Sequence, residues 1–501
     1  MHTADRGRGH DLAAGDSLAP ADALTQCARL IEQSALELVR FVWCDTHGQT
    51  RGKTLTRDAA LRALHSGVGM VSTLMLKDTS DRTAYKVFEP GMTDALPGFA
   101  HANNLLLRPL PERFRVLPWA ERTGWIQCQP TFVDGTPVPV DTRALLQAAL
   151  ARLSERGLGM VCGLEIEFHI YRLRDAEHGA DLDPAHAAWP GLAPEVSLIH
   201  PGYNLLSEAW FDRAEAPLRI VQHTAQALGL PLSSLEIELG PSQVEAVFDA
   251  TDALTAADNM VLFRSAVQQA LRRAGYHATF MCRPPFEQIM SSGWHLHQSL
   301  VSLADGRNAF MRDVPAAGTD ARDARHVLSD LGAQYLAGLL AHAKGMTVMC
   351  TPTANGFGRF RPNALAPQSI LWGLDNRGAM LRVIGGAGDA ATRIENRLGE
   401  PAANPYLYMA AQIHAGLAGI DAGQMPPEAT ESPYAELPPE ARIPTSLSDA
   451  LQALAEDPAM GHGFGTDFVR HYSRLKAAEQ QRFEAAEDKL EFQRREYFSR
   501  I

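Results

Sequence analysis

The sequence predicts an α+β protein in which a small domain precedes a large one. Apolar residues recur at helical spacing over residues 21–40, and a short run rich in β-forming residues overlaps the end of this pattern at 39–44. The turn signal Asp45-Thr-His-Gly48 closes that run, and we expect strands and loops to alternate from there to about Val133. Helix and strand patterns mixed in this way are typical of the α+β class.

The end of the small domain is marked by a turn and two prolines. Asp134-Gly135 is a turn signal, Pro137 and Pro139 follow it, and a helical pattern starts after Asp141. We therefore expect a domain boundary near residue 138. The predicted organisation is a solvated tail over 1–20, a first domain over 21–137 and a second domain over 138–501.

The composition argues against several classes of function. The 501 residues include 46 Lys and Arg against 58 Asp and Glu, and the net charge of −12 argues against a nucleic-acid partner. No uncharged apolar run is long enough to span a membrane, and the N-terminus lacks the apolar core of a secretory signal. The six cysteines show no CxxC spacing, so we expect buried, reduced thiols in a cytoplasmic protein.

Two segments carry pairs of acids in patterns that suit a metal site. In Gly163-Leu-Glu165-Ile-Glu167-Phe168, alternation along a strand puts both glutamates on one face. A Gly-Pro corner separates Glu238 from Glu245, so adjacent strands could direct both carboxylates into one pocket. Neighbouring carboxylates repel unless something neutralises them, and a divalent cation does so. Taken alone, the first pattern is more often a solvated strand face, and the second is a weak signal.

Histidines and arginines complete this set. His295 and His297 share one strand face and could bind a divalent metal, although such a pair is more often structural. Burial of a guanidinium group is costly without an anionic partner, so arginines in an apolar region indicate phosphate or carboxylate binding. Any one of them alone also fits a surface ion pair. They are Arg359, Arg361, Arg377, Arg382, Arg393 and Arg397, with Glu395 between the last two.

In this order, the segments resemble the glutamine synthetase family. The matching pieces are GxExEF at 163–168, ExxPxQxE at 238–245, GxHxHxSL at 293–300, NxxxRxxP at 355–362, NRxxxxR at 376–382 and RIExR at 393–397. The match covers most of residues 39–497. The resemblance implies a small N-terminal β-grasp domain and a large C-terminal catalytic domain, in which helices pack on a curved antiparallel sheet. The chain has no GxxxxGK[ST] motif and is therefore not a P-loop enzyme.

The resemblance implies two or three Mg²⁺ or Mn²⁺ ions in each site, with ATP as a co-substrate. One metal would face the substrate carboxylate and another the phosphates of ATP. The implied ligands are Glu167, Glu238 and Glu245 for the first metal, and Glu165, His295 and Glu395 for the second.

The resemblance also implies which residues bind the nucleotide. Arg377 and Arg382 would clamp phosphate, with help from Arg393, and His297 and Ser299 would line the nucleotide site.

Glutamate would be bound by Glu167, Arg359 and Arg397, and catalytic roles would fall to Arg359, Arg377 and Glu395. The implied reaction has two steps. The γ-carboxylate of glutamate first takes the γ-phosphoryl group of ATP, and an amine then attacks the acyl phosphate.

The sequence departs from the ammonia-using members of the family where the amine should bind. Leu365 stands where those members have a glutamate that closes the site and helps deprotonate ammonium. The family's loop with an ammonium-binding aspartate is also absent, and Asp94 is the one acid left in Met92–Pro97. We expect an amine pocket formed by Met92, Asp94, Leu365 and Trp294. Met290-Ser291 replaces the family's Asn-Gly, which weakens the expected contacts to the α-groups of glutamate.

A binding site without those carboxylates suits an amine that is larger than ammonia, or one that is already uncharged near pH 7. The sequence is therefore most similar to the γ-glutamyl amide synthetases that act on organic amines, including anilide-forming and polyamine-acting members. We favour an apolar or aromatic amine such as aniline. A polyamine or alkylamine is the alternative, and ammonia is less favoured. A non-catalytic member should have lost metal ligands, whereas all six positions remain.

The resemblance implies two further properties. The family's site is a funnel between neighbouring subunits, so we expect a homo-oligomer, a dodecamer of two hexameric rings. Some bacterial members are nucleotidylated on a tyrosine that precedes LPPE. Here Tyr434 precedes Leu437-Pro-Pro-Glu440 with one extra residue, and we expect it to be an ordinary exposed loop tyrosine.

Overall fold

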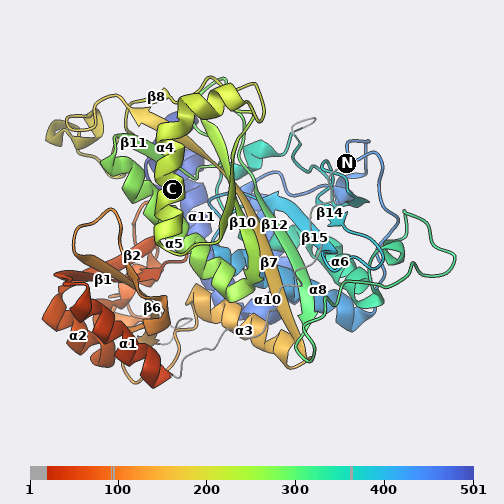
Figure 1. The fold of residues 1–501 in the computed structure, drawn as a ribbon, viewed down its shortest axis with the longest axis horizontal. Helices are drawn as coiled ribbons and strands as arrows, with labels where there is room; N and C mark the ends of the chain where they lie inside the picture. The colour runs from red at the N-terminus through yellow and green to blue at the C-terminus, as the bar shows by residue number, and fades with distance from the viewer. Residues whose placement is uncertain (1–19, 92, 94–95, 97, 362–364) are drawn as a thin grey trace.

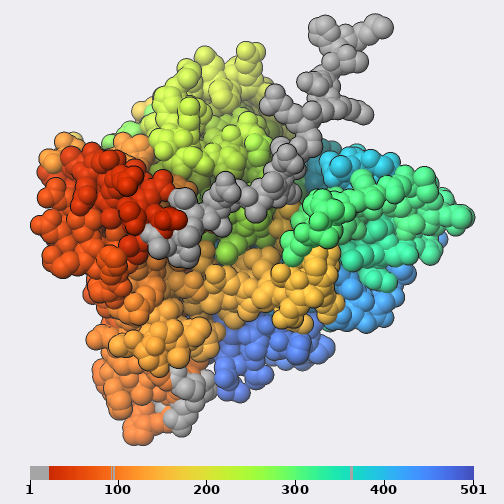
Figure 2. Space-filling model, turned by 60° about the horizontal axis from the view of Figure 1, so that its bottom comes forward, coloured from red at the N-terminus to blue at the C-terminus, as the bar shows by residue number. Residues whose placement is uncertain are grey.

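Two β-sheets organise the chain in the computed structural model, which describes residues 20–501 apart from 92, 94, 95, 97 and 362–364. The mixture of helices and largely antiparallel sheets confirms the predicted α+β class (Figure 1). The first sheet lies wholly before residue 138 and the second wholly after it. The boundary itself stays a prediction. In the space-filling view, the N-terminal residues, red to orange, gather on one side of the molecule (Figure 2).

The first sheet has six strands in the order β2-β1-β6-β4-β3, with β5 beside β6. The helical pattern expected over 21–40 ends early, at Gln33, because Ala35 has a left-handed φ of 47° that stops a helix. The predicted turn after the first strand is confirmed, since Asp45 accepts hydrogen bonds from the backbone amides of His47 and Gln49. The elements are α1 (Pro20–Gln33), β1 (Leu38–Cys44), β2 (Thr50–Thr56), α2 (Arg57–Ser66), β3 (Val68–Val71), β4 (Asn104–Pro109), β5 (Arg115–Val116) and β6 (Thr123–Phe132).

The second sheet has nine strands in the order β13-β14-β15-β12-β7-β10-β9, with β8 and β11 also paired to β7. Its strands are β7 (Leu158–Leu173), β8 (Val196–Leu198), β9 (Leu232–Ile237), β10 (Gln243–Asp252), β11 (Tyr276–Thr279), β12 (Trp294–Ser302), β13 (Trp372–Leu374), β14 (Leu381–Ile384) and β15 (Arg393–Gly399). The helices that accompany it are α3 (Thr142–Ser154), α4 (Glu208–Ala227), α5 (Ala253–Arg273), α6 (Asp330–Ala341), α7 (Ala343–Cys350), α8 (Pro405–Ala422), α9 (Leu447–Glu456), α10 (Pro458–Phe464), α11 (Thr466–Ala485) and α12 (Lys489–Gln493).

One face of the second sheet is apolar and covered by helices. Along β7, Leu164, Ile166 and Phe168 are buried, whereas the residues between them are only partly covered. Helices α3 and α5 contact β7. On β12, Trp294 packs edge-to-face on Tyr408 of α8. This helical layer leaves the opposite face of the sheet to the acids and histidines.

A buried aspartate joins segments from both sheets. Asp258 on α5 accepts hydrogen bonds from Gln127 of β6, from Arg143 of α3 and from Tyr406 of α8. It also forms an ion pair with Arg113, which precedes β5. Removal of one partner from a buried charge pair typically costs about 3–5 kcal/mol, so this contact fixes how the first sheet meets the helices behind the second.

All six cysteines are buried and free, as expected. Within the part of the chain that the structure describes, no helix has the length and apolar character that crossing a membrane requires.

Candidate active site

Strand register brings the predicted acids and histidines to one place. In the antiparallel ladders of β7, Glu165 pairs with His295 of β12, and Glu167 pairs with Glu245 of β10. In the same way, Glu395 of β15 lies opposite His297 of β12. Directly opposed residues on one face of an antiparallel pair have their Cβ atoms about 4.5–5.5 Å apart. Three pairings therefore gather side chains from four adjacent strands.

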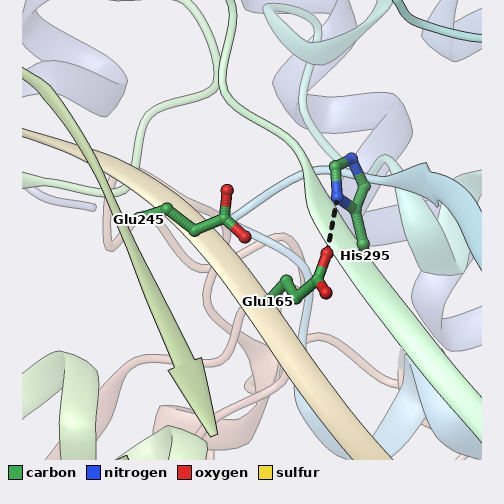
Figure 3. A group of neighbouring side chains, drawn as sticks. All are labelled: Glu165, Glu245 and His295. Carbon is green, nitrogen blue, oxygen red and sulfur yellow. Dashed lines mark hydrogen bonds and ion pairs between the residues drawn. The ribbon is translucent and has the colours of Figure 1, made fainter. Parts of the chain in front are cut away.

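The side chains converge on a common space. Glu165, Glu245 and His295 come from three neighbouring strands and point toward one another (Figure 3). Glu165 Oε1 lies 3.0 Å from His297 Nε2, and Glu165 Oε2 lies 3.4 Å from His295 Nδ1. His295 Nδ1 is also 3.7 Å from Glu395 Oε1. Glu165 therefore stands at the centre of the cluster.

Two groups of side chains in this cluster could hold a metal ion. Within each group, one ligand atom per residue lies within 4.8 Å of the others. The groups are Glu165, Glu245 and His295, and Glu165, His297 and Glu395. The two groups contain five residues, of which four are predicted ligands and the fifth, His297, is not. The grouping differs from the predicted one, because Glu165 belongs to both groups and His297 takes part. The assignment of each acid to one metal stays a prediction.

Burial and neighbouring acids shift the pKa values of several groups in the cluster. Burial raises the pKa of Glu245 to about 10, with further increases from Glu167, Glu165 and Glu238. Burial and the charge of Glu238 likewise raise the pKa of Glu167 to about 8. Burial lowers the pKa of His295 to about 4, so its imidazole is neutral and able to bind a metal. The donor set therefore fits divalent cations, which would neutralise the acids.

Arginines surround the carboxylate of Glu395. Nη1 of Arg382 lies 3.0 Å from Glu395 Oε2, and Arg397 donates to Glu395 Oε1. Arg359 donates through Nη1 to the backbone oxygen of Arg397 at 2.8 Å, and Arg393 donates through Nε to His297 Nδ1 at 3.0 Å. Four of the predicted anion-binding arginines therefore meet the cluster.

Among the contacts of the described residues, two predicted arginines do not reach the cluster: the exposed Arg361 and Arg377. The side chain of Arg377 is exposed and lines a separate surface pocket of about 390 Å³. In the described residues, no hydrogen bond or ion pair joins it to the cluster. The neighbouring Asp375 instead holds Arg382, through a hydrogen bond of 2.9 Å from Nε.

A cavity of about 660 Å³ opens beside the cluster. Four predicted residues line it, namely Glu165, His297, Ser299 and Arg393. Four residues that were not predicted also line it: Phe248, Arg307, Asn308 and Met311. No spacing signal marks these residues, because they reach the cavity from the middle of β10 and from the segment that follows β12.

Another missed residue holds Glu167 in place. Gln243, at the start of β10, donates from Nε2 to Glu167 Oε2 at 2.8 Å and is almost fully buried. The same amide group also lies within hydrogen-bonding distance of Ser291 O and Ser292 Oγ. Its place in the ExxPxQxE segment was the available signal.

The structure describes two of the four residues that were predicted to form the amine pocket. Met92 and Asp94 lie outside the described residues. Leu365 has a left-handed φ of 53°, its side chain is 58% exposed, and its backbone oxygen accepts a hydrogen bond from Arg397 Nη2 at 3.3 Å. A leucine in this conformation is held under strain, which is most common at functional sites.

Trp294 does not line the pocket, which corrects our expectation. It is fully buried and pairs with Ile166 of β7, whereas its neighbour His295 pairs with Glu165. Successive side chains on a strand point to opposite faces, so Trp294 faces the helical layer. A residue beside a ligand in sequence is therefore not beside it in the site.

Tyr434 also differs from expectation, because it is not freely exposed. The residue is half-buried and its hydroxyl oxygen is shielded from solvent. A methyl group on Gly378 would lie 3.2 Å from Cε2 of Tyr434, so the ring packs against the backbone beside Arg377.

Comparisons with known proteins agree with this arrangement. The profile of the glutamine synthetase catalytic domain matches residues 139–495. The γ-glutamylanilide synthase of an Acinetobacter species is 36% identical over 95% of this chain and 96% of its own. A glutamate–isopropylamine ligase of a Pseudomonas species is 29% identical over 90% of this chain and 92% of its own.

A solved structure resembles the whole chain. The GmaS/ADP complex has a TM-score of 0.73 and 27% sequence identity, and the match covers 94% of this chain and 98% of that one. Together with the extent of the catalytic-domain match, this shows that the chain belongs to the glutamine synthetase family.

Proposed function

We propose that this protein is an ATP-dependent ligase that joins the γ-carboxylate of glutamate to an organic amine. An oxygen of that carboxylate takes the γ-phosphoryl group, and ADP leaves. The amine nitrogen then attacks the acyl carbon, phosphate leaves, and the nitrogen loses a proton. The observation that carries this proposal is the cluster around Glu165, which lies between a large cavity and a set of anion-binding arginines.

ATP and glutamate would be bound by different groups of residues. His297, Ser299 and Arg393 line the cavity of about 660 Å³, which we assign to ATP, and the ADP bound by a protein of similar structure supports this. Arg382, which reaches the cluster at Glu395, would hold phosphate oxygens. Planar guanidinium groups form paired hydrogen bonds to phosphate and carboxylate, which suits these roles.

Glutamate would lie on the Glu167 side of the cluster. Arg359 and Arg397 are buried there, and their charges, which act to lower the pKa of Glu167, would attract an incoming carboxylate. Glu167, Glu238 and Glu245 would hold one Mg²⁺ or Mn²⁺, and Glu165, His295 and Glu395 another, with a third possible through His297. When bound, these ions neutralise phosphate oxygens as charge develops on them.

Leu365 supports an apolar amine. Its exposed side chain offers an apolar surface and cannot hold an ammonium group. Its backbone oxygen accepts a hydrogen bond from Arg397, which helps to hold the residue in place. An aromatic amine is uncharged near neutral pH, so it needs neither a carboxylate partner nor deprotonation before attack. The relative that forms γ-glutamylanilide supports this preference. The relative that acts on isopropylamine supports an alkylamine as the alternative.

We also propose a cytoplasmic homo-oligomer, a dodecamer of two hexameric rings. Support comes from large apolar side chains that are exposed around β8 and the start of α4: Leu198, Tyr203, Leu205, Leu206 and Phe211. Exposed apolar patches of this kind commonly mark protein contacts. The buried free thiols suit a reducing compartment.

Light scattering on the active protein should therefore give the mass of a dodecamer. A monomer that retains full activity would contradict the oligomer, because the family's site is shared between subunits.

The substitution Glu395→Ala should abolish amine-dependent phosphate release. The change removes a proposed metal ligand and also leaves Arg382 and Arg397 without their shared partner. Since outer partners of metal ligands already contribute about 10–100-fold, we expect a loss of at least about 100-fold. The exposed Glu456→Ala is the matched control, and Glu395→Gln, which keeps the side-chain shape, guards against loss of folding. Near-normal release by Glu395→Ala would rule out the metal assignment.

The substitution Leu365→Glu should raise the use of ammonium and lower the use of aniline. A carboxylate at this position can hold and deprotonate a cationic amine, whereas it removes apolar contact from an aromatic one. The measurement is kcat/KM for each amine at saturating glutamate and ATP. Leu365→Met keeps the volume and apolar character and should leave the preference unchanged. If both variants share the wild-type preference, Leu365 does not contact the amine.

A further inference from the structure

Arg359 projects from a turn that follows α7. The turn covers residues 351–356 and leads into the short 3₁₀ helix Gly356–Arg359. The amide of Gly356 donates back to Thr353, to its backbone oxygen at 3.1 Å and to its Oγ1 at 3.0 Å. Since Arg359 is buried and lies only three residues beyond this closure, the shape of the turn sets where its guanidinium group lies.

A buried acid with no part in the proposed chemistry holds this turn. Glu400 directly follows β15 and is fully buried. Its Oε1 accepts a hydrogen bond from the amide of Thr353 at 2.8 Å, and its Oε2 accepts one from Oγ1 of Thr353 at 2.9 Å. A buried acid is costly without hydrogen bonds, so Glu400 stabilises the turn only when Thr353 stays in this place. The contact joins the turn that carries Arg359 to the strand that carries Arg397.

The packing around Glu400 leaves the turn little freedom. A methyl group on Gly356 would lie 2.6 Å from Oε2 of Glu400 and 2.5 Å from Cγ2 of Thr351, which is too close for a side chain. Oγ1 of Thr351 donates to the backbone oxygen of Leu398 at 2.8 Å, and the amide of Glu400 donates to the backbone oxygen of Cys350 at 2.9 Å. Hydrogen bonds therefore join the end of α7 and its turn to the end of β15.

The C-terminal helices hold the turn at its next two residues. The amide of Ala354 donates to the hydroxyl oxygen of Tyr497 at 3.3 Å, and this hydroxyl lies 2.5 Å from Glu479 Oε1. Asn355 Nδ2 donates to Gln493 Oε1 at 2.7 Å. Because these contacts lie outside the acid and histidine cluster, the position of Arg359 depends on groups remote from the substrates.

We propose that Glu400 is a positioning residue that holds Arg359 in place for binding glutamate. This rests on the proposed function, because it explains how one of the proposed glutamate-binding groups is kept in its orientation. Arg359 donates to the backbone oxygen of Arg397 at 2.8 Å, so a shift of the turn would break this contact. Glu400 is not among the described residues that line the cavity assigned to ATP. Its loss should therefore weaken the binding of glutamate far more than that of ATP.

Thr353→Val tests the contact and keeps the branched shape of the side chain. It removes the hydroxyl that links Glu400 to the amide of Gly356. The KM for glutamate should rise about 10-fold and the KM for ATP stay within about twofold, because outer partners of binding groups contribute about 10–100-fold. Thr353→Ser keeps the hydroxyl and should keep the wild-type KM. Thr347→Val is the matched control, because this buried hydroxyl bonds within its own helix, to the backbone oxygen of Ala343 at 2.8 Å.

Two substitutions test the acid itself. Glu400→Gln keeps an acceptor for the amide of Thr353 and a donor for its hydroxyl, so it should behave like the wild type. Glu400→Ala removes both contacts and should raise the KM for glutamate about 10–100-fold. If Glu400→Ala fails to fold, the comparison of Thr353→Val with Thr353→Ser decides. Equal increases in the KM for glutamate and for ATP, or no increase in either, would overturn the proposal.

A crystal structure of Thr353→Val gives a readout that needs no activity. We expect the guanidinium group of Arg359 to move away from the backbone oxygen of Arg397, while β15 keeps its place. An unmoved Arg359 would overturn the proposal. If the wild-type protein forms no amide with any amine, the proposed function fails. A displaced Arg359 would still support the role of Glu400, so the two failures can be told apart.

Discussion

The pairing of β7 with its two neighbours is the constraint on which the site depends. β7 places Glu165 beside His295 and Glu167 beside Glu245, and β12 in turn places His297 beside Glu395. A slip of one residue in either ladder would turn every acid toward the helices and every buried apolar residue toward the substrates. The apolar alternation of Leu164, Ile166 and Phe168 therefore fixes the chemistry on the other face, because burial of that set permits one register only.

The site contains buried acids that repel one another and arginines that attract anions. Burial, together with repulsion between neighbouring acids, raises the pKa values of Glu167, Glu238 and Glu245, and such a set of carboxylates suits divalent cations. Arg382 and Arg397 share Glu395. Positive and negative groups thus lie close together in the cluster, and Leu365 presents an apolar side chain where we propose that the amine binds. Specificity then depends on which charges are absent as much as on which are present.

Strand alternation predicted much of this site, and it also explains the errors. Glu165, Glu167, His295 and His297 could be placed on one face because period-two spacing is local to each strand. The same rule, applied to Trp294, would have excluded it from the pocket. Residues such as Phe248 and Asn308 reach the cavity through long-range folding, which spacing cannot reveal. The exposure of Arg377 and the shielding of the Tyr434 hydroxyl likewise depend on loops packed from elsewhere in the chain.

The most direct test of the central claim is phosphate release by the wild-type protein with glutamate, MgATP and one amine at a time. The amines are aniline, isopropylamine, putrescine and ammonium. Because the amine position offers apolar surface and no carboxylate at Leu365, we expect aniline to give the highest kcat/KM and ammonium to be poor. The fastest turnover with ammonium or putrescine would contradict the account, since a cationic amine would then bind beside Leu365, which offers no carboxylate.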